Sequence, residues 1–184
     1  MEFRPLRASE IDCRVAMVKY TEKTKGVSLL LYKDARCDMR ILDETVGMEN
    51  WQREHYECKG NLFCKVGIKC GDEWVYKSDC GVESYTEKEK GESSDSFKRA
   101  CVNFGIGREL YTAPFIWIDG EKVNIKDSGR KDQRGNPIYT TYDRFEVEKI
   151  IIEKGEITAL AVKNITKNCR AFIWQKGKDN ESSN

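Results

Sequence analysis

Three short segments with strand character follow one another in the middle of the chain, separated by turns of only two or three residues. They are Trp51–Cys58, Leu62–Cys70 and Glu73–Cys80, and both turns contain glycine. Every second residue of Leu62–Cys70 is apolar, whereas Lys65 and Lys69 lie on the alternate positions. Because side chains alternate between the two sides of a strand, this pattern predicts an antiparallel meander with one buried face.

A helix with one apolar side is predicted directly after the meander. Its apolar residues recur at helical spacing, at Phe97, Ala100, Cys101 and Phe104. Gly105 and Gly107 end it, and the capping-box pattern Thr86–Glu89 marks a possible start. The order of strands and helix therefore predicts a β-β-β-α arrangement.

The remaining elements are predicted from the same periodicities. Before the meander we expect a helix over Ser9–Val18, a strand over Val27–Tyr32 that continues through Arg36, and a helix over Met39–Val46. After the helix we expect a strand at Phe115–Ile118, a mobile polar loop at Ser128–Pro137, a hairpin of Phe145–Ile152 with Glu156–Lys163, and a strand at Arg170–Gln175.

These elements indicate the α+β class, with an antiparallel β-β-β-α core and an additional β-rich C-terminal region. We divide the chain into a core of residues 1–114, a β-rich extension of the same domain at 115–177, and a disordered tail at 178–184. The extension is expected either to enlarge the core sheet or to cover a binding groove. A length of 184 residues is consistent with one domain.

The composition excludes some classes of protein. No apolar run is long enough to span a membrane and the first residues lack a signal-peptide core, which predicts a cytoplasmic protein.

The eight cysteines form no Cys-x-x-Cys pair, so we expect reduced, buried thiols and no metal. The single histidine, His55, is interpreted as a sheet residue. With a net charge of +1, binding to nucleic acid would depend on local clusters of cations.

The helix after the meander carries one such cluster. Lys90, Ser94 and Lys98 lie four residues apart and therefore share one side of the helix, and Arg99 follows directly. A row of this kind can contact successive phosphates. The alternative is an ordinary amphipathic helix with a solvated face.

Two further groups of cations are candidates. Arg36 lies at the end of the predicted apolar strand, where its guanidinium could bind phosphate; the alternative is a salt bridge to Asp38 or Asp43. Lys65 and Lys69 could extend a basic surface over the outer face of the meander, together with Lys77 and Arg53. The alternative there is that lysines only prevent edge pairing.

The sequence contains little that indicates an enzyme. It lacks the nucleotide-binding pattern Gly-x-x-x-x-Gly-Lys-[Ser/Thr], so no cofactor is expected. Asp43 with Glu57 and Lys59 weakly matches the Asp…Glu-x-Lys pattern of Mg²⁺-dependent nucleases, which leaves nuclease activity as an alternative. No other catalytic residues are predicted.

Four blocks resemble a known family in order and spacing: Tyr32–Arg36, Leu42–Trp51, Asp79–Val82 and Ser94–Gly105. They are similar to the Rad-fifty-two-like single-strand annealing proteins of homologous recombination, especially the phage and prophage members. The resemblance runs from about Val27 to Tyr111.

The resemblance implies a DNA-annealing protein that works without ATP as a ring or filament of identical subunits. Arg36 and Lys98 match the family's DNA-contacting arginine and lysine, Arg99 matches the next arginine, and Lys90 and Ser94 match positions that line the same groove. Val102 replaces a further arginine, and Met48 replaces a tyrosine.

The implied partners are single-stranded DNA, further copies of the chain, and a phage exonuclease or a single-strand-binding protein in a bacterial host cell. A plain single-strand-binding protein is the second alternative. It would protect strands but slow their pairing, and it would depend more on aromatic stacking than on Arg36 and Lys98.

Overall fold

A computed structural model describes residues 1–82 and 88–178, and it confirms the α+β class. Contacts divide the chain into two compact units. Unit 1 contains Met1–Leu6 and Lys33–Arg108, and unit 2 contains Arg7–Tyr32 and the chain from Glu109 onward. Each unit is described by itself. The functional division after residue 114 stays a prediction.

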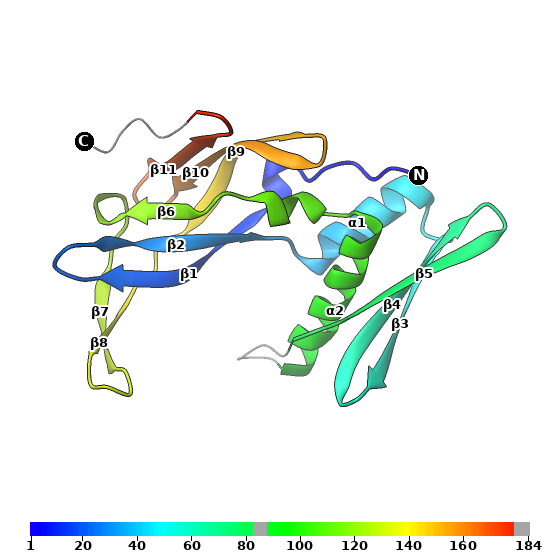
Figure 1. Cartoon of the computed structure of the whole chain (residues 1–184), viewed down its shortest axis with the longest axis horizontal. Coiled ribbons are helices and arrows are strands. Elements are labelled where there is room, and N and C mark those ends of the chain that lie inside the picture. The colour runs from blue at the N-terminus through cyan, green and yellow to red at the C-terminus, as the bar shows by residue number, and fades with distance from the viewer. Residues whose placement is uncertain (83–87, 179–184) are drawn as a thin grey trace. The chain divides into compact units, whose positions relative to one another are not determined.

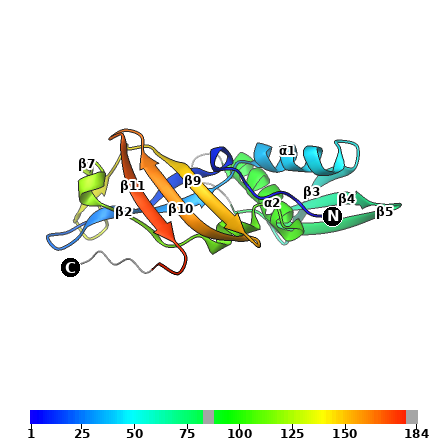
Figure 2. The same ribbon diagram turned by 90° about the horizontal axis from the view of Figure 1, so that it is seen from above.

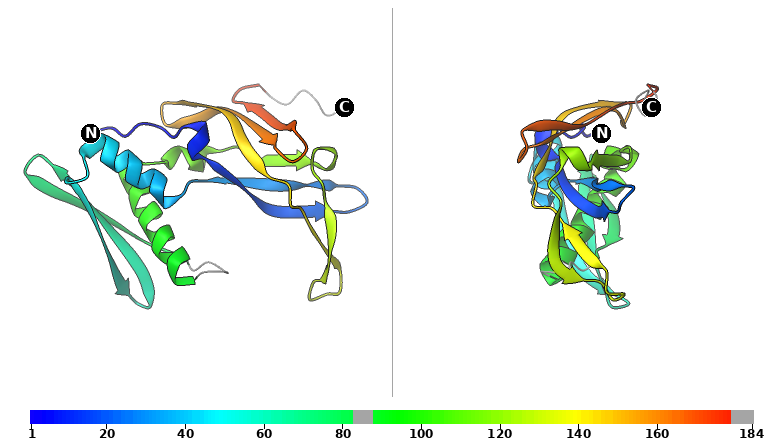
Figure 3. Two further views of the ribbon diagram at one scale, coloured as in Figure 1. Left: turned by 180° about the vertical axis from the view of Figure 1, so that it is seen from behind. Right: turned by 90° about the vertical axis from the view of Figure 1, so that its left-hand side faces the viewer.

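Unit 1 contains the predicted meander and both α-helices. The strands β3 (Trp51–Cys58), β4 (Asn61–Cys70) and β5 (Glu73–Cys80) form one antiparallel sheet in this order. Helix α2 (Lys88–Phe104) lies against β4 and β5 and contacts α1 (Ala35–Val46), as Figure 3 shows for the two helices and the sheet. The β-β-β-α arrangement is therefore confirmed.

The start of α1 differs from the prediction. The strand β2 (Lys25–Tyr32) ends before Lys33, so the predicted continuation of this strand through Arg36 is wrong. Asp34 begins the helix instead, because its side chain accepts a hydrogen bond of 2.8 Å from the backbone N–H of Cys37. Arg36 therefore lies in the first turn of α1.

Unit 2 is built on a six-stranded sheet in the order β11-β10-β9-β1-β2-β6 (Figures 1 and 2). Its further strands are β1 (Asp12–Tyr20), β6 (Ile116–Asp119), β9 (Phe145–Glu153), β10 (Glu156–Asn164) and β11 (Cys169–Gln175). The core contains Val27, Leu29, Ile116, Ile118, Ile157, Leu160 and Val162. Short 3-10 helices lie at Ala8–Glu10, Arg108–Thr112 and Gly120–Lys122.

Two predictions for unit 2 are wrong, and one alternative of a third is excluded. The helix over Ser9–Val18 is the strand β1, and a bulge between Val15 and Met17 interrupts its alternation. The polar loop Ser128–Pro137 belongs to a two-stranded ribbon of β7 (Lys126–Lys131) and β8 (Pro137–Thr140). The C-terminal strands pair with one another and, through β9, with β1, so they do not enlarge the β3–β5 sheet, and the alternative that they cover a binding groove stays a prediction.

Some predictions fall outside the described residues or concern single side chains. The capping box Thr86–Glu89 begins outside the described residues, as does the tail after Lys178. All eight cysteines are free. The expectation of buried thiols is met by Cys37, Cys64 and Cys101 and is wrong for Cys58 and Cys70, which are exposed, while the other three are half-buried. Among residues 1–82 and 88–178, no helix has the length and apolar character needed to cross a membrane.

Candidate nucleic-acid interface

Helix α2 is firmly anchored on the side opposite its solvent-facing residues. Phe97 is fully buried, with its ring 6.1 Å from that of Trp51 on β3. The guanidinium carbon of Arg53 lies 4.6 Å from the centre of the Phe97 ring. His55 lies on β3, as predicted, with Nε2 3.1 Å from the Ser93 carbonyl oxygen. These contacts hold α2 at a defined position on the sheet.

The two adjacent cations of α2 project in different directions. Lys98 Nζ lies 3.7 Å from Asp95 Oδ1, and its charge also acts on Asp38 of α1. Arg99 Nε instead lies 3.3 Å from Asp79 Oδ1 on β5. Successive residues of a helix are turned by about 100°, so Lys98 faces α1 and Arg99 faces the sheet edge. Lys98 is the less tightly paired of the two, although its side chain is only 27% exposed.

The predicted row along α2 is compatible with its helical geometry. Lys90, Ser94 and Lys98 all lie within the helix Lys88–Phe104, four residues apart. Lys90 is exposed, and Ser94 and Lys98 are half-buried. The structure thus places all three on one side of one rigid element.

Arg36 lies on the exposed side of α1. The alternative salt bridges to Asp38 and Asp43 are absent from the described residues: Asp38 pairs with Lys33, and Asp43 Oδ1 accepts a hydrogen bond of 2.7 Å from Trp51 Nε1. Arg40 is also exposed and lies four residues after Arg36, hence on the same side of α1. Sequence analysis overlooked Arg40, although this i, i+4 spacing was visible.

A buried ion pair lies at the start of α1, within electrostatic reach of Lys98. The side chains of Lys33 and Asp38 are 4% and 0% exposed and form a short salt bridge. Burial raises the pKa of Asp38 to about 6, although the positive charges of Lys33 and Lys98 oppose this rise. Asp38 Oδ2 has no hydrogen-bond partner in the part of the chain that the structure describes. The pair was not predicted, because a lysine that follows a strand is normally exposed.

The outer face of the meander, turned away from α2, carries Lys65 and Lys69, as predicted. Lys65 is opposite Ser78, and Lys69 is opposite Trp74. The expectation that Arg53 and Lys77 share this face is wrong, because both are opposite Val66 and therefore lie on the helix side. Lys77 Nζ donates a hydrogen bond of 2.6 Å to the Asn103 carbonyl at the end of α2.

Four aromatic residues accompany the lysines on this outer face. The rings of Tyr56 and Phe63 are 5.6 Å apart, and those of Trp74 and Tyr76 are 6.3 Å apart. Lys65 Nζ lies 5.5 Å from the centre of the Tyr76 ring and 2.7 Å from Glu54 Oε2. We call Tyr56, Phe63, Trp74 and Tyr76 the aromatic outer face. Such rings offer stacking surfaces to unpaired bases.

The residues of the nuclease alternative lie far apart. Asp43 contacts Trp51 at the start of β3, whereas Glu57 lies six residues further along this strand, roughly 20 Å away at about 3.3 Å per residue. No group of three or more histidine, cysteine, aspartate or glutamate side chains suited to a metal occurs in residues 1–82 and 88–178. The geometry therefore does not favour metal-dependent cleavage by these residues.

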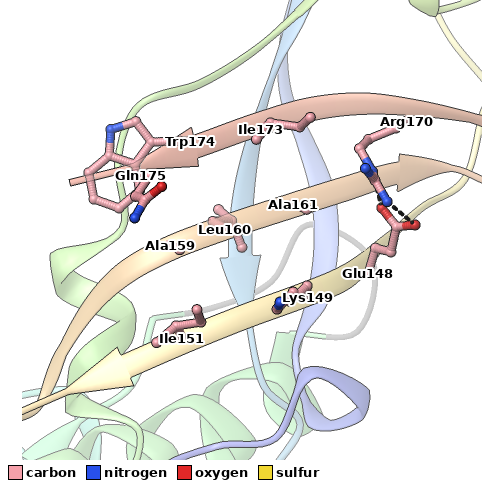
Figure 4. A pocket seen from close by; sticks show the side chains of 10 residues that line it. All are labelled: Glu148, Lys149, Ile151, Ala159, Leu160, Ala161, Arg170, Ile173, Trp174 and Gln175. Atoms are coloured by element: carbon pink, nitrogen blue, oxygen red, sulfur yellow. Dashed lines mark hydrogen bonds and ion pairs between the residues drawn. The ribbon is translucent and has the colours of Figure 1, made fainter. Parts of the chain in front are cut away.

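Unit 2 has a cavity of about 470 Å³ on β9, β10 and β11 (Figure 4). Arg170 of β11 and Glu148 of β9 face each other across β10, with Arg170 Nε 2.5 Å from Glu148 Oε2. Apolar side chains such as Ile151, Leu160 and Ile173 line much of the remainder. Because its arginine is already paired with a carboxylate, this cavity is poorly suited to phosphate.

The sequence of the chain matches one known protein and one known protein family. Over 100 residues the chain is 34% identical to the single-stranded DNA-binding protein DdrA of Deinococcus radiodurans, covering 53% of this chain and 47% of that protein. The chain thus spans about half the length of this relative. No solved structure matches. Residues 14–128, more than half of the chain, match the Rad52/22 family of double-strand break repair proteins, and the chain belongs to this family.

Proposed function

We propose that this protein binds single-stranded DNA through its phosphate backbone and anneals complementary strands without ATP. The observation that carries the proposal is Lys98, a half-exposed cation on a helix fixed by the buried ring of Phe97. Because α2 is already held in place, its backbone loses little conformational freedom when Lys98 binds a phosphate, which favours binding. Membership of the Rad52/22 family and the similarity to DdrA support the same ligand.

The proposed contact surface combines residues from both helices of unit 1. Lys98, Lys90 and Ser94 share one side of α2, Arg99 follows Lys98 but lies toward Asp79 at the edge of the sheet, and Arg36 and its neighbour Arg40 come from α1. Exposed guanidinium groups such as that of Arg36 can bind a phosphate through two parallel hydrogen bonds. Binding would then depend strongly on salt and little on base sequence.

Assembly of several copies would compensate for the small net charge. A chain of net charge +1 attracts DNA weakly as a whole. In a ring or filament, each subunit would add one row of cations to a continuous strip, and the contacts would act together. The phage origin and the partner exonuclease or host single-strand-binding protein stay predictions.

The test is the rate at which two labelled complementary oligonucleotides pair without ATP. The wild type is expected to accelerate pairing. A charged hydrogen bond contributes about 1.5–3 kcal/mol, so Lys98→Ala should lower strand affinity by at least about tenfold and abolish most of the acceleration. Lys59→Ala, which removes an exposed lysine from the β3–β4 turn, is the matched control. Binding by the wild type without any acceleration would refute annealing.

The aromatic outer face favours a second candidate, a protein that only protects single strands. Its stacked pairs Tyr56–Phe63 and Trp74–Tyr76 could each hold bases and keep them from pairing. This candidate predicts slower pairing in the presence of the wild type, and restored pairing after Trp74→Ala. The same assay therefore separates the two functions by the sign of the effect.

A further inference from the structure

The β7–β8 ribbon of unit 2 carries cations that have no role in the function proposed above. Lys126, Arg130, Lys131 and Arg134 are all exposed. Arg130, Lys131 and Arg134 form no ion pair with any residue that the structure describes. Residues 126–140 contain four cations and two carboxylates, a net charge of +2. Figure 1 shows the ribbon as two strands that extend away from β1 and β2.

Both carboxylates of the ribbon are engaged in shaping its turns. Asp127 Oδ1 accepts a hydrogen bond of 2.8 Å from the Gly129 N–H. Asp132 Oδ1 accepts from the N–H groups of Arg134 and Asn136, at 2.8 and 2.9 Å. These bonds lower the pKa of Asp132 and give the loop a defined shape. The acids therefore orient the backbone of the ribbon, and the arginine side chains remain available to a ligand.

A basic cavity of about 440 Å³ lies at the base of the ribbon. Three lysines, Lys25, Lys126 and Lys167, line it together with Tyr20, and Glu121 is the acidic residue of its lining. The volume falls in the range of small-molecule sites, about 300–1,000 Å³. Lys167 Nζ donates a hydrogen bond of 2.5 Å to the Glu121 carbonyl oxygen. Three lysines around one concave surface favour a phosphate group over a neutral ligand.

Aromatic rings connect this cavity to the ribbon. Tyr20 at the end of β1 stacks on Tyr139 of β8, with ring centres 4.2 Å apart. Lys25 Nζ lies 4.8 Å from the centre of the Tyr20 ring. Tyr142, two residues after β8, is 79% exposed. Cations that alternate with accessible aromatic rings are typical of surfaces that bind nucleic acid.

We infer that the ribbon and the lysine cavity form a second nucleic-acid contact surface, which binds the phosphodiester backbone. Six residues of β7 extend over about 20 Å, so the cations of the ribbon are spread over a length suited to a polymer and not to a single small anion. A two-stranded ribbon also fits the major groove of duplex DNA. The family match ends at residue 128, before Arg130, Lys131 and Arg134.

This inference rests on the proposed function, since a second surface has a purpose only if unit 1 already holds one strand. One chain could then bind a strand through α2 and a second strand, or the annealed duplex, through the ribbon. Single-stranded and duplex DNA share the phosphodiester chemistry, and separate arms of the experiment distinguish them.

The experiment measures how many labelled oligonucleotides each chain binds at saturation, and how affinity depends on salt. The full chain is titrated with a thymine oligonucleotide in one arm and with a duplex in the other. The combined variant Arg130→Ala, Lys131→Ala, Arg134→Ala is expected to bind one DNA molecule fewer per chain in at least one arm. Its salt dependence should weaken by about 0.7 per lost contact for single strands, or about 0.9 for duplex.

The control variant Lys149→Ala, Lys154→Ala, Lys178→Ala removes the same charge from other exposed positions of unit 2. It should keep the wild-type stoichiometry. A ribbon variant that matches the wild type in stoichiometry and salt dependence, in both arms, would overturn the inference alone. A wild type that binds neither probe would overturn the proposed function as well. Circular dichroism checks that each variant remains folded.

Discussion

The two faces of the β3–β5 meander consist of the same three strands but contribute differently to the protein. On the inner face, Cys64, Val66 and Ile68 are completely buried. On the outer face, Lys69 is exposed and Tyr76 is 47% exposed. Adjacent residues of one strand thus belong either to the core or to a candidate binding surface. Substitutions on the two faces should therefore separate stability from DNA binding.

The largest expected effect is a loss of stability where α2 packs on the inner face of the meander. Phe97→Ala removes a fully buried ring that stacks on Trp51, and should lower the free energy of unfolding by about 3–5 kcal/mol. Tyr76→Ala on the outer face should cost less than about 1 kcal/mol. Urea denaturation of both variants tests the contrast, and similar losses would show that the outer face also supports the fold.

Replacing the lysine of the buried ion pair Lys33–Asp38 should destabilise the protein nearly as much. Lys33→Met leaves Asp38 buried without its counter-charge, which costs about 3–5 kcal/mol at pH 7. The pKa of Asp38 is raised to about 6, so the folded state binds a proton more readily than the unfolded state. The contribution of Asp38 to stability therefore falls as pH rises from about 4 to 6.

In Lys33→Met this pKa should rise further, so the variant should lose less stability at pH 5 than at pH 7. Denaturation at both pH values measures this difference. Lys59→Met, at an exposed turn of the same unit, is the control and should show no such pH dependence.

On the outer face, the expected effect is on binding. Trp74→Ala should weaken single-stranded DNA binding by about 1–3 kcal/mol if one base stacks there, with little change in stability. Trp74→Phe keeps a flat ring and should retain most of the affinity. Fluorescence anisotropy with a labelled oligonucleotide tests both. Equal affinity of Trp74→Ala and the wild type would remove stacking at this position from consideration.

The smallest expected effect concerns the exposed pair Lys65–Glu54. Their side chains are 39% and 65% exposed, and their interaction raises the pKa of Lys65 and lowers that of Glu54. A double-mutant cycle with alanine at both positions should give a small coupling energy, well below that of the buried pair, which decreases with added salt. If the coupling energy of Lys65–Glu54 were as large as that expected for Lys33–Asp38, burial would not explain why one ion pair is stronger than the other.

Much of the fold could be predicted because its signals are local. Alternation in Leu62–Cys70 and the spacing of Phe97 and Phe104 each correspond to one regular element. Strand β1 was predicted as a helix because Val15 and Val18 are three residues apart, as on one side of a helix. The bulge between Val15 and Met17 shifts the alternation of the strand and so allows this spacing in a strand. The β7–β8 ribbon has almost no buried side chains, so no alternation marked its strands.

The candidate site was less predictable than the fold. The cations of α2 followed from helical spacing, but Asp79, the partner of Arg99, lies on β5 and could not be identified from spacing alone. Asp34 is a typical N-cap residue and marks the start of α1, so Arg36 could have been assigned to a helix. This signal was overlooked. Which face of the sheet Lys77 occupies depends on strand register, which the turn after Cys70 sets.

Gly81 follows β5 and donates a backbone hydrogen bond of 3.0 Å to the Leu62 carbonyl. A methyl group at this position would lie 2.1 Å from the carbonyl oxygen of Glu92 in α2, too close for any real side chain. A substitution of one surface cation removes that cation and leaves the others in place. A single mutation at Gly81 would instead displace α2 and misalign Lys90, Ser94, Lys98 and Arg99 together, so a residue that contacts no DNA would have the broadest effect on function.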